Sequence, residues 1–190
     1  MSSSEPTDAE LVRGVLADDD RARNQLMDRH LPQVLQWCAR LGGPLVDPED
    51  AAQDVFIVVL TRIGQLRDPE LFRPWLFGVV RRVLAKHRRR VWLKRWVGDV
   101  PEGALHPGRS PDDMAASIEE GRQVHEALDA LPRIQREALV LCDLEGHSAT
   151  EAAELLGVPS GTVKSRLRLG RARFRKEAAR QGLHLAWSLP

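Results

Sequence analysis

The sequence has little cysteine, few aromatic residues and no long apolar run, and each of these absences excludes a class of protein. Its 190 residues contain no Tyr, four Phe and two Cys. Cys38 and Cys142 lie far apart without Cys-x-x-Cys spacing, so we interpret them as structural thiols rather than a disulfide or a zinc site. No apolar run approaches the roughly 18 residues of a membrane span. The N-terminus is polar and acidic, unlike a signal peptide, and we therefore expect a cytoplasmic protein with no membrane partner.

Sequence patterns of catalytic sites are also missing. There is no Gly-rich phosphate loop, no metal-binding triad and no Ser nucleophile elbow. The acidic pair Asp112-Asp113 stands in a Pro- and Gly-rich segment, where no pocket is expected to raise a carboxyl pKa. His125 and His147 have no partner pattern, and we interpret them as surface residues. We therefore predict that the protein is not an enzyme and needs neither a cofactor nor a metal.

The charge is small in sum but unevenly distributed. The formal net charge is +1. Residues 1–60 contain eleven acidic residues against five arginines, whereas residues 81–98 contain eight basic residues and no acidic one. Residues 164–180 contain eight basic residues and one acidic residue. This distribution predicts one acidic surface and two basic ones, and two separate basic patches suggest two contacts with nucleic acid.

Helical periods and helix caps dominate the chain, and we find no alternating strand pattern. Residues 98–113 contain three Gly and three Pro without periodicity, which is typical of a linker. We therefore predict an all-α protein of two small helical domains, 8–97 and 115–180, joined by a flexible linker over 98–114.

Four helices are expected in the first domain and four in the second. In the first domain Asp8 is expected to cap one helix, and residues 19–41 to form the next. Asp47 followed by Pro48 is a strong start for a third, and a fourth begins near Pro74 and runs through the basic tract. The second domain is expected to contain helices at 115–130 and 133–145, followed by a helix-turn-helix.

The helix-turn-helix is predicted at residues 148–173, SATEAAELLGVPSGTVKSRLRLGRAR. Ser148 followed by Glu151 is a capping box, and Gly157 fits the left-handed position at the end of the first helix. Ser160 is expected to cap the second helix. A recognition helix reads base edges with its N-terminal residues and holds phosphates with its basic flank. The candidate DNA contacts are Thr162, Lys164, Ser165, Arg166, Arg168 and Arg171.

The alternative interpretation of this segment is a solvated basic helix in an ordinary bundle. The caps, the turn and the buried stripe all agree with the helix-turn-helix, and this agreement disfavours the alternative. The buried stripe consists of Val163, Leu167, Gly170 and Phe174.

A second stripe combines Trp75 with the basic residues that follow it at helical spacing. Taken alone, this pattern is better explained by a partly buried Trp with a solvated rim of cations. A cationic track with aromatic surfaces is also the way that proteins hold single-stranded DNA. The residues of the stripe are Trp75, Val79, Arg82, Lys86 and Arg89, within a basic run that begins at Arg81.

Three segments together resemble one family. They are PEDAAQDVFIVVLTRI at 48–63, LFRPWLFGVVRRVLAKHRRR at 71–90 and ALDALPRIQREALVLCDLEGHSATEAAELLGVPSGTVKSRLRLGRAR at 127–173. Over roughly residues 8–178 the chain resembles the extracytoplasmic-function sigma factors, small promoter-specificity subunits of bacterial RNA polymerase. The resemblance implies a sigma region 2, a linker, a sigma region 4 and a function in transcription initiation.

The resemblance also implies roles for residues. It places Asp50, Gln53 and Asp54 on the helix that docks on the polymerase clamp helices. It places residues 160–175 in the major groove of the −35 element, and it assigns melting and holding of the −10 element to the residues Trp75, Arg81, Arg82, Lys86 and Arg89. The implied partners are core RNA polymerase, through its clamp helices and flap, promoter DNA and an anti-sigma factor.

The sequence departs from the family pattern at two positions. Many members carry Asn where this chain has Arg82, and many carry Arg where it has Leu169. Two other functions remain open at this point. A stand-alone helix-turn-helix regulator would bind duplex operators tightly, as a dimer and without polymerase. A protein adaptor without DNA binding would have no use for two basic patches.

Overall fold

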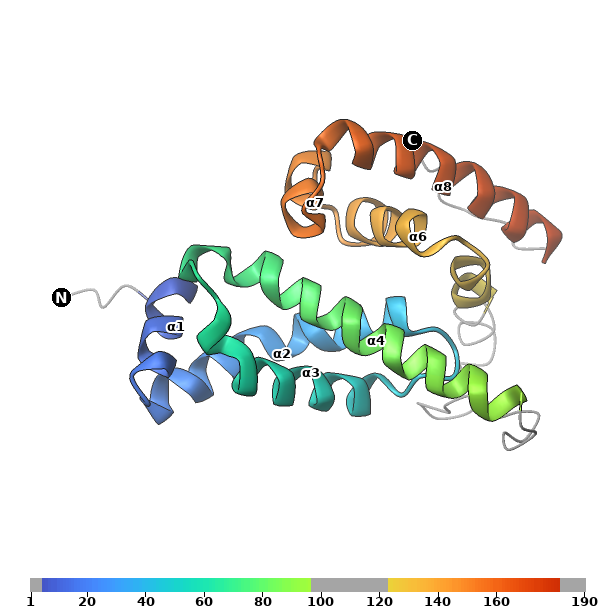
Figure 1. Cartoon of the computed structure of the whole chain (residues 1–190). Coiled ribbons are helices and arrows are strands. Elements are labelled where there is room, and N and C mark those ends of the chain that lie inside the picture. The colour runs from blue at the N-terminus through green and yellow to red at the C-terminus, as the bar shows by residue number, and fades with distance from the viewer. Residues whose placement is uncertain (1–4, 97–122, 182–190) are drawn as a thin grey trace, which may run out of the picture.

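The protein folds into two helical bundles, and all regular elements of the described residues are helices (Figure 1). The computed structural model describes residues 5–96 and 123–181. The N-terminal bundle contains α1 (Asp8–Leu16), α2 (Asp20–Gly42), α3 (Pro48–Arg62), η1 (Ile63–Gln65), η2 (Pro69–Leu71) and α4 (Phe72–Trp96). The C-terminal bundle contains a helix whose described part is 123–129, then α6 (Arg133–Leu139), η3 (Val140–Leu144), α7 (Ala149–Leu156) and α8 (Ser160–Arg180). The predicted all-α class is confirmed, and the predicted linker at 98–114 lies outside the described residues.

Side-chain caps fix where the helices of the N-terminal bundle begin. Asp47 accepts hydrogen bonds from two backbone N–H groups at the start of α3, with Pro48 in the first position, as predicted. Asp19 caps α2 in the same way. The prediction that Asp8 caps α1 is wrong, because Thr7 takes that place in a capping box with Glu10.

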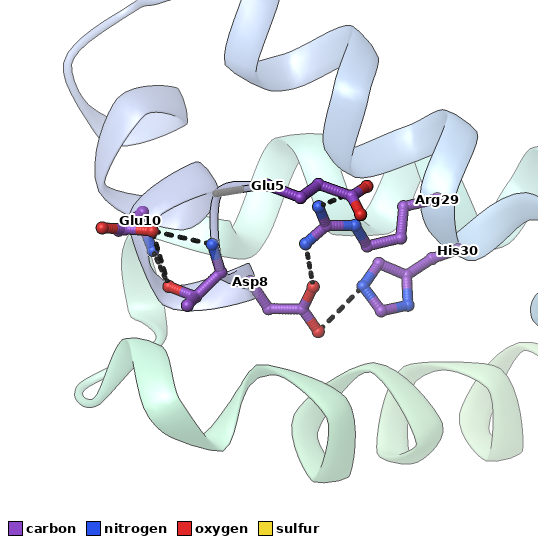
Figure 2. A network of polar contacts seen from close by, with 6 residues as sticks. Glu5, Asp8, Glu10, Arg29 and His30 are labelled. Atoms are coloured by element: carbon purple, nitrogen blue, oxygen red, sulfur yellow. Dashed lines mark hydrogen bonds and ion pairs between the residues drawn. The ribbon is translucent and has the colours of Figure 1, made fainter. Parts of the chain in front are cut away.

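Asp8 instead joins α1 to α2 through a partly buried polar network (Figure 2). Its carboxylate accepts a hydrogen bond of 2.9 Å from Arg29, which also donates to Glu5 over 3.2 Å. The other oxygen of Asp8 lies 3.1 Å from Nε2 of His30. His30 is only 7% exposed and meets the ring of Phe72 edge-on, with centroids 5.1 Å apart. The network therefore fixes α1 against α2 and the start of α4.

The core of the N-terminal bundle lies between α2, α3 and α4. Trp37 of α2 packs edge-on against Phe77 of α4, with ring centroids 4.8 Å apart. α4 is one continuous helix, and Val79 is fully buried in it. Val79 therefore belongs to the core. Its spacing in the sequence had placed it in one stripe with Trp75 and the basic residues of α4.

The C-terminal bundle contains the predicted helix-turn-helix. Ser148 and Glu151 form the expected capping box at α7, and Gly157 ends α7 with a φ of 64°, in the left-handed region that favours glycine. The prediction that Ser160 caps α8 is wrong, because Pro159 occupies the cap position without a side-chain bond. Ser160 is already the first helical residue, so its hydroxyl stands one position too late to cap.

α6 and α8 approach each other closely at one glycine. A Cβ atom on Gly170 would lie 3.1 Å from the carbonyl oxygen of Gln135. The buried Phe174 lies one turn further along α8. The helix expected at 133–145 is α-helical only as far as Leu139, and a π-helical turn at Val140–Leu144 follows it.

The two bundles pack on each other along α2, α4 and α7, with the C-terminal bundle above α4 in the view of Figure 1. His125 lies 3.1 Å from the carbonyl oxygen of Ala39, and the side chain of His147 is only 18% exposed. Both histidines are therefore half-buried rather than fully exposed. Within the described ranges, no helix is both long and apolar enough to cross a bilayer, and no group of three acidic, His or Cys residues could hold a metal ion.

Candidate nucleic-acid interface

The start of α8 presents polar side chains to solvent. Lys164, Ser165 and Arg168 are exposed, and Thr162 and Arg166 are half-buried. The opposite face of the helix is anchored by the buried Val163, Gly170, Phe174 and Ala178. These five predicted contacts are therefore at least partly accessible on one well-anchored helix.

Arg171, the sixth predicted contact, differs from the other five. Its guanidinium donates two hydrogen bonds, of 3.0 and 2.7 Å, to the two carboxylate oxygens of Asp143. The side chain of Asp143 is only 5% exposed, and this hydrogen-bonded pair raises the pKa of Arg171. The pair joins α8 to η3, so the Arg171 side chain holds α8 in place rather than extending towards solvent.

The five candidates on α4 divide into two groups. Arg82, Lys86 and Arg89 are exposed. Arg81 donates a hydrogen bond of 2.8 Å to the buried carboxylate of Glu137 in the C-terminal bundle. Trp75 is half-buried, with its ring 6.0 Å from that of Phe72.

Trp75 lines a cleft between the two bundles. The cleft has a volume of about 700 Å³ and lies between the start of α4 and α7. Arg73 and Trp75 line one side, and His147, Glu151 and Leu155 line the other. Arg81 is therefore bonded to the C-terminal bundle, and Trp75 lines the cleft between α4 and α7.

α3 presents a different kind of surface, which is acidic and apolar. Asp50 and Gln53 are exposed, as predicted. Asp54 lies 2.8 Å from Nε2 of His87 on α4, so one of its oxygens is directed towards the bundle. Ile57 is 54% exposed and Leu60 is 39% exposed on the same helix.

Sequence reasoning left Ile57 and Leu60 out of the candidate site. α3 is apolar almost all around its circumference, and its buried residues are Ala51, Ala52, Val55, Phe56 and Val59. Within the unbroken apolar run 55–60, residue type alone does not separate the buried residues from the exposed ones. The spacing of Ile57 and Leu60 from Gln53, four and seven residues, could have indicated a shared face.

The two bundles correspond to two known families of sequence segments. The family model for Sigma-70 region 2 matches residues 26–94, and that for Sigma-70, region 4 matches residues 121–174. The ECF RNA polymerase sigma factor SigM of Mycobacterium tuberculosis is 32% identical over 170 residues, which cover 90% of this chain and 84% of that protein. This chain belongs to the ECF sigma factors.

Two solved structures have a similar fold. The structure of CnrH in complex with the cytosolic domain of CnrY has a TM-score of 0.67 and 26% identity, over 91% of this chain and 97% of that one. The sigma factor RpoE in complex with the anti-sigma factor NepR from Bartonella quintana has a TM-score of 0.58, also with 26% identity, over 82% of this chain and 96% of that one.

The candidate residues of this ECF sigma factor all lie within the two matched segments. The α3 and α4 candidates lie in the region 2 match, and the α8 candidates lie in the region 4 match. The two basic helices therefore belong to the two different matched regions, α4 to region 2 and α8 to region 4.

Proposed function

We propose that this ECF sigma factor binds core RNA polymerase and directs it to promoters, reading the −35 element with α8 and opening the −10 element with α4. The observation that carries the proposal is the presence of two exposed basic helix faces on two separate bundles, with a face of opposite character on α3. In this proposal the functional domains are 8–97 and 115–180, joined by 98–114.

The −35 role of α8 is supported by its anchoring and its exposure. Gly170 and Phe174 fix the helix on α6, and Asp143 fixes it through Arg171. A helix held in this way presents its N-terminal side chains to the major groove at a defined angle, where Arg and Ser side chains bond base edges. We assign base contacts to Thr162, Ser165 and Arg166 and phosphate contacts to Lys164 and Arg168.

The −10 role of α4 is supported by an aromatic ring beside exposed cations. Arg82, Lys86 and Arg89 offer a track for phosphates, and Trp75 offers a surface on which a base can stack. Stacking contributes about 1–3 kcal/mol per base, and unstacking a base from duplex costs a few kcal/mol. Contacts of this size can offset the cost of opening the −10 element.

The polymerase contact is assigned to α3. Asp50 and Gln53 with Ile57 and Leu60 form an acidic and apolar face that would repel DNA but suits a protein surface with basic and apolar residues. We propose that this face docks on the polymerase clamp helices, with Asp54 at its edge, and that region 4 contacts the flap.

The location of the protein, its class and its regulation follow from this role. A protein that works with RNA polymerase acts in the cytoplasm, as an initiation factor and not as an enzyme. In one solved structure the sigma factor RpoE is bound to the anti-sigma factor NepR, and in the other CnrH is bound to the cytosolic domain of CnrY. We propose that an anti-sigma factor also controls this chain.

The proposal is tested by a gel-shift titration on one promoter fragment, with and without core polymerase, followed by run-off transcription. We expect specific binding and a specific transcript only when polymerase and this protein are both present. Tight binding to the duplex by the protein alone would favour a stand-alone regulator, and binding to neither DNA nor polymerase would contradict the proposal.

A further inference from the structure

Four arginines and two acidic residues line one cavity between α4 and α6. The cavity has a volume of about 250 Å³. The arginines are Arg81 and Arg88 on α4 and Arg133 and Arg136 on α6, and the acidic residues are Asp129 and Glu137. We call this site the arginine cavity. It is separate from the wider cleft that Trp75 lines, with which it shares no residue.

Helical spacing gathers these side chains on one face of each helix. The lining residues of α4, counted from Arg81, stand at positions i, i+3, i+4 and i+7, and end at Arg88. The lining residues of α6, counted from Arg133, stand at i, i+3 and i+4. Residues at these intervals are neighbours on a helix surface. Two short basic stripes, one on each helix, therefore face the same space.

Glu137 holds two of the arginines with a single oxygen. This oxygen accepts hydrogen bonds from Arg81 over 2.8 Å and from Arg133 over 3.2 Å. A guanidinium has five N–H donors, and each of these two arginines uses one nitrogen in the contact. Within the part of the chain that the structure describes, their other nitrogens contact no carboxylate. Most of the donors of Arg81 and Arg133 are therefore available to a ligand.

Asp129 holds the other two arginines in the same way. One of its oxygens lies 2.6 Å from Arg88 and 2.7 Å from Arg136. Arg136 also donates to the backbone carbonyl oxygens of Asp129 and Leu131, and it is buried, so it forms a fixed part of the wall. Four guanidinium groups and two carboxylates leave the lining with a net charge of +2.

The charge and the size of the cavity indicate the kind of ligand that fits it. A phosphate group on an organic ester carries about −1.5 to −2 charges near pH 7, which balances the charge of the lining. Guanidinium groups bond phosphate oxygens through pairs of N–H donors. The volume is far above the roughly 10–15 Å³ that one water needs and just below the roughly 300–1,000 Å³ of pockets for drug-sized molecules. The ligand is therefore small and carries little besides its phosphate.

We propose that the arginine cavity binds a phosphate group, either as inorganic phosphate or as a small phosphate ester. Arg133 is 60% exposed and receives the phosphate at the edge of the cavity. Arg81 and Arg88 hold it from α4, and Arg136 keeps the wall in place. A strand of nucleic acid is held along an extended basic groove, whereas this cavity has room for one small group.

The test uses the full chain, free in solution, and two variants of the cavity. Arg133→Gln removes a positive charge of the lining without removing an ion pair between the bundles, because Arg133 pairs within α6. Ala85→Phe fills the cavity without a change of charge, since Ala85 lines it from an exposed position of α4. Arg90→Gln is the matched control, because it removes the same charge from an exposed position of α4 outside the cavity. None of the three belongs to the proposed DNA-binding or polymerase-docking set.

Binding is measured by the backbone amide chemical shifts of the ¹⁵N-labelled protein at pH 7.5 and constant ionic strength. The protein is titrated with inorganic phosphate and, separately, with glycerol 3-phosphate. We expect saturable shifts centred on the cavity, at Leu84, Leu131 and Glu137. Tighter binding of glycerol 3-phosphate would assign the cavity to an ester, and tighter binding of inorganic phosphate would assign it to the free anion.

We expect Arg133→Gln to raise the dissociation constant at least about tenfold, because a hydrogen-bonded charge is lost. Ala85→Phe should abolish saturable binding, and Arg90→Gln should leave the dissociation constant unchanged. Thermal unfolding checks that each variant is folded, and if Ala85→Phe is not, Arg133→Gln and the wild-type shifts decide the result. Shifts in the wild type that do not saturate, or that spread over the exposed basic faces of α4 and α8, would overturn the proposal. An equal weakening in Arg133→Gln and Arg90→Gln would overturn it as well.

The outcome is independent of the proposed function. The titration involves neither polymerase nor promoter, so a failure to bind phosphate leaves the role in transcription standing. Conversely, a failure of run-off transcription by the wild-type protein would contradict that role and leave the phosphate site intact.

Discussion

The environment of His30 shows how one residue couples the fold to pH. Its ring lies in the interior against Phe72, with Asp8 on one side (Figure 2). Burial lowers the pKa of His30, and the charge of Asp8 only partly offsets this, while Arg73 and Arg29 lower it further. Burial also raises the pKa of Asp8, but the hydrogen bond from Arg29 and the charge of His30 outweigh it, so that the pKa lies below its ordinary value.

We therefore predict that the free energy of unfolding falls as the pH drops below the ordinary histidine pKa of about 6.5. A depressed pKa means that the unfolded chain binds the proton more tightly, so stability is complete above that pH and is lost as the pH falls through the folded-state value. The loss is about 1.4 kcal/mol for each unit by which the pKa is lowered. Urea unfolding at pH 7.5 and pH 5 measures it, and a His30→Gln protein with an equally steep decrease would contradict the assignment.

Arg171 and Asp143 are expected to stabilise the C-terminal bundle. Because each removes the same buried pair, Arg171→Ala and Asp143→Ala should each lower the free energy of unfolding, by about 1–3 kcal/mol. The double variant should lose much less than the sum of the two, as coupled residues do. The measurement is chemical denaturation of the three variants. If the loss in the free energy of unfolding of the double variant equals the sum of the two single losses, the pair does not act as a unit, and Arg171 is again a candidate DNA contact.

The sequence alone could not distinguish Arg171 from Arg168. Both lie on α8 with basic neighbours, and their spacing suits a phosphate-binding flank. The difference depends on Asp143, which is far from Arg171 in the sequence and is directed at it by the π-helical turn of η3. Burial of an ion pair between distant segments leaves no periodic pattern in a sequence.

At the scale of elements, α8 is expected to separate base reading from phosphate binding along its length. Arg166 lies in the second turn of the helix, and Arg175 lies nine residues further, about 14 Å along the axis at 1.5 Å per residue. Arg166→Ala should therefore relax the −35 preference, at about 1–3 kcal/mol for the base it reads. Arg175→Ala should weaken binding to every sequence alike.

The measurement is a binding competition of the sigma–polymerase complex across a library of −35 variants. Arg175→Ala serves as the control for loss of charge, because it removes the same side chain at an exposed position of the same helix. A uniform loss of affinity in both variants would contradict base reading by Arg166.

α3 offers a test of the polymerase contact. Asp50→Lys reverses a charge on the exposed face, and we expect it to weaken binding to core polymerase, more at low salt than at high salt. Ile57→Ser should weaken the binding with little dependence on salt, since it removes apolar contact. Thermal unfolding checks that both proteins remain folded, and unchanged affinity of both in a pull-down titration would exclude this face.

The elements themselves were largely predictable from local chemistry. The capping box at Ser148, the glycine end at Gly157 and the Asp47-Pro48 start all follow from side chains within one helical turn of the backbone groups they satisfy. The two wrong predictions of helix caps are also local. Thr7 rather than Asp8 caps α1, and Pro159 rather than Ser160 occupies the cap position of α8. Neither error moves a helix by more than about two residues.

At the scale of the whole molecule, the packing of the two bundles was not predictable. Ion pairs between the two bundles join residues that are 41 to 105 positions apart in the sequence, from Arg88 with Asp129 to Arg40 with Glu145. Nothing within either segment indicates its partner. The sequence revealed the two basic helices, but only the structure shows that Arg81 is covered while Arg82 next to it is exposed.

The exposed position of Arg82 leads to the last prediction. Each bundle is assigned a separate contact with the promoter, so a defect on α4 should leave the −35 contact of α8 intact. We expect Arg82→Ala to lower the fraction of open complexes and to alter the preference at one −10 base, with unchanged binding to the −35 duplex. A template already mismatched across the −10 element should restore opening, because the cost of unstacking has then been removed. Permanganate footprinting on matched and mismatched promoters measures both effects. Normal opening of the matched promoter, with the same base preference, would show that Arg82 is a solvated residue without a part in melting.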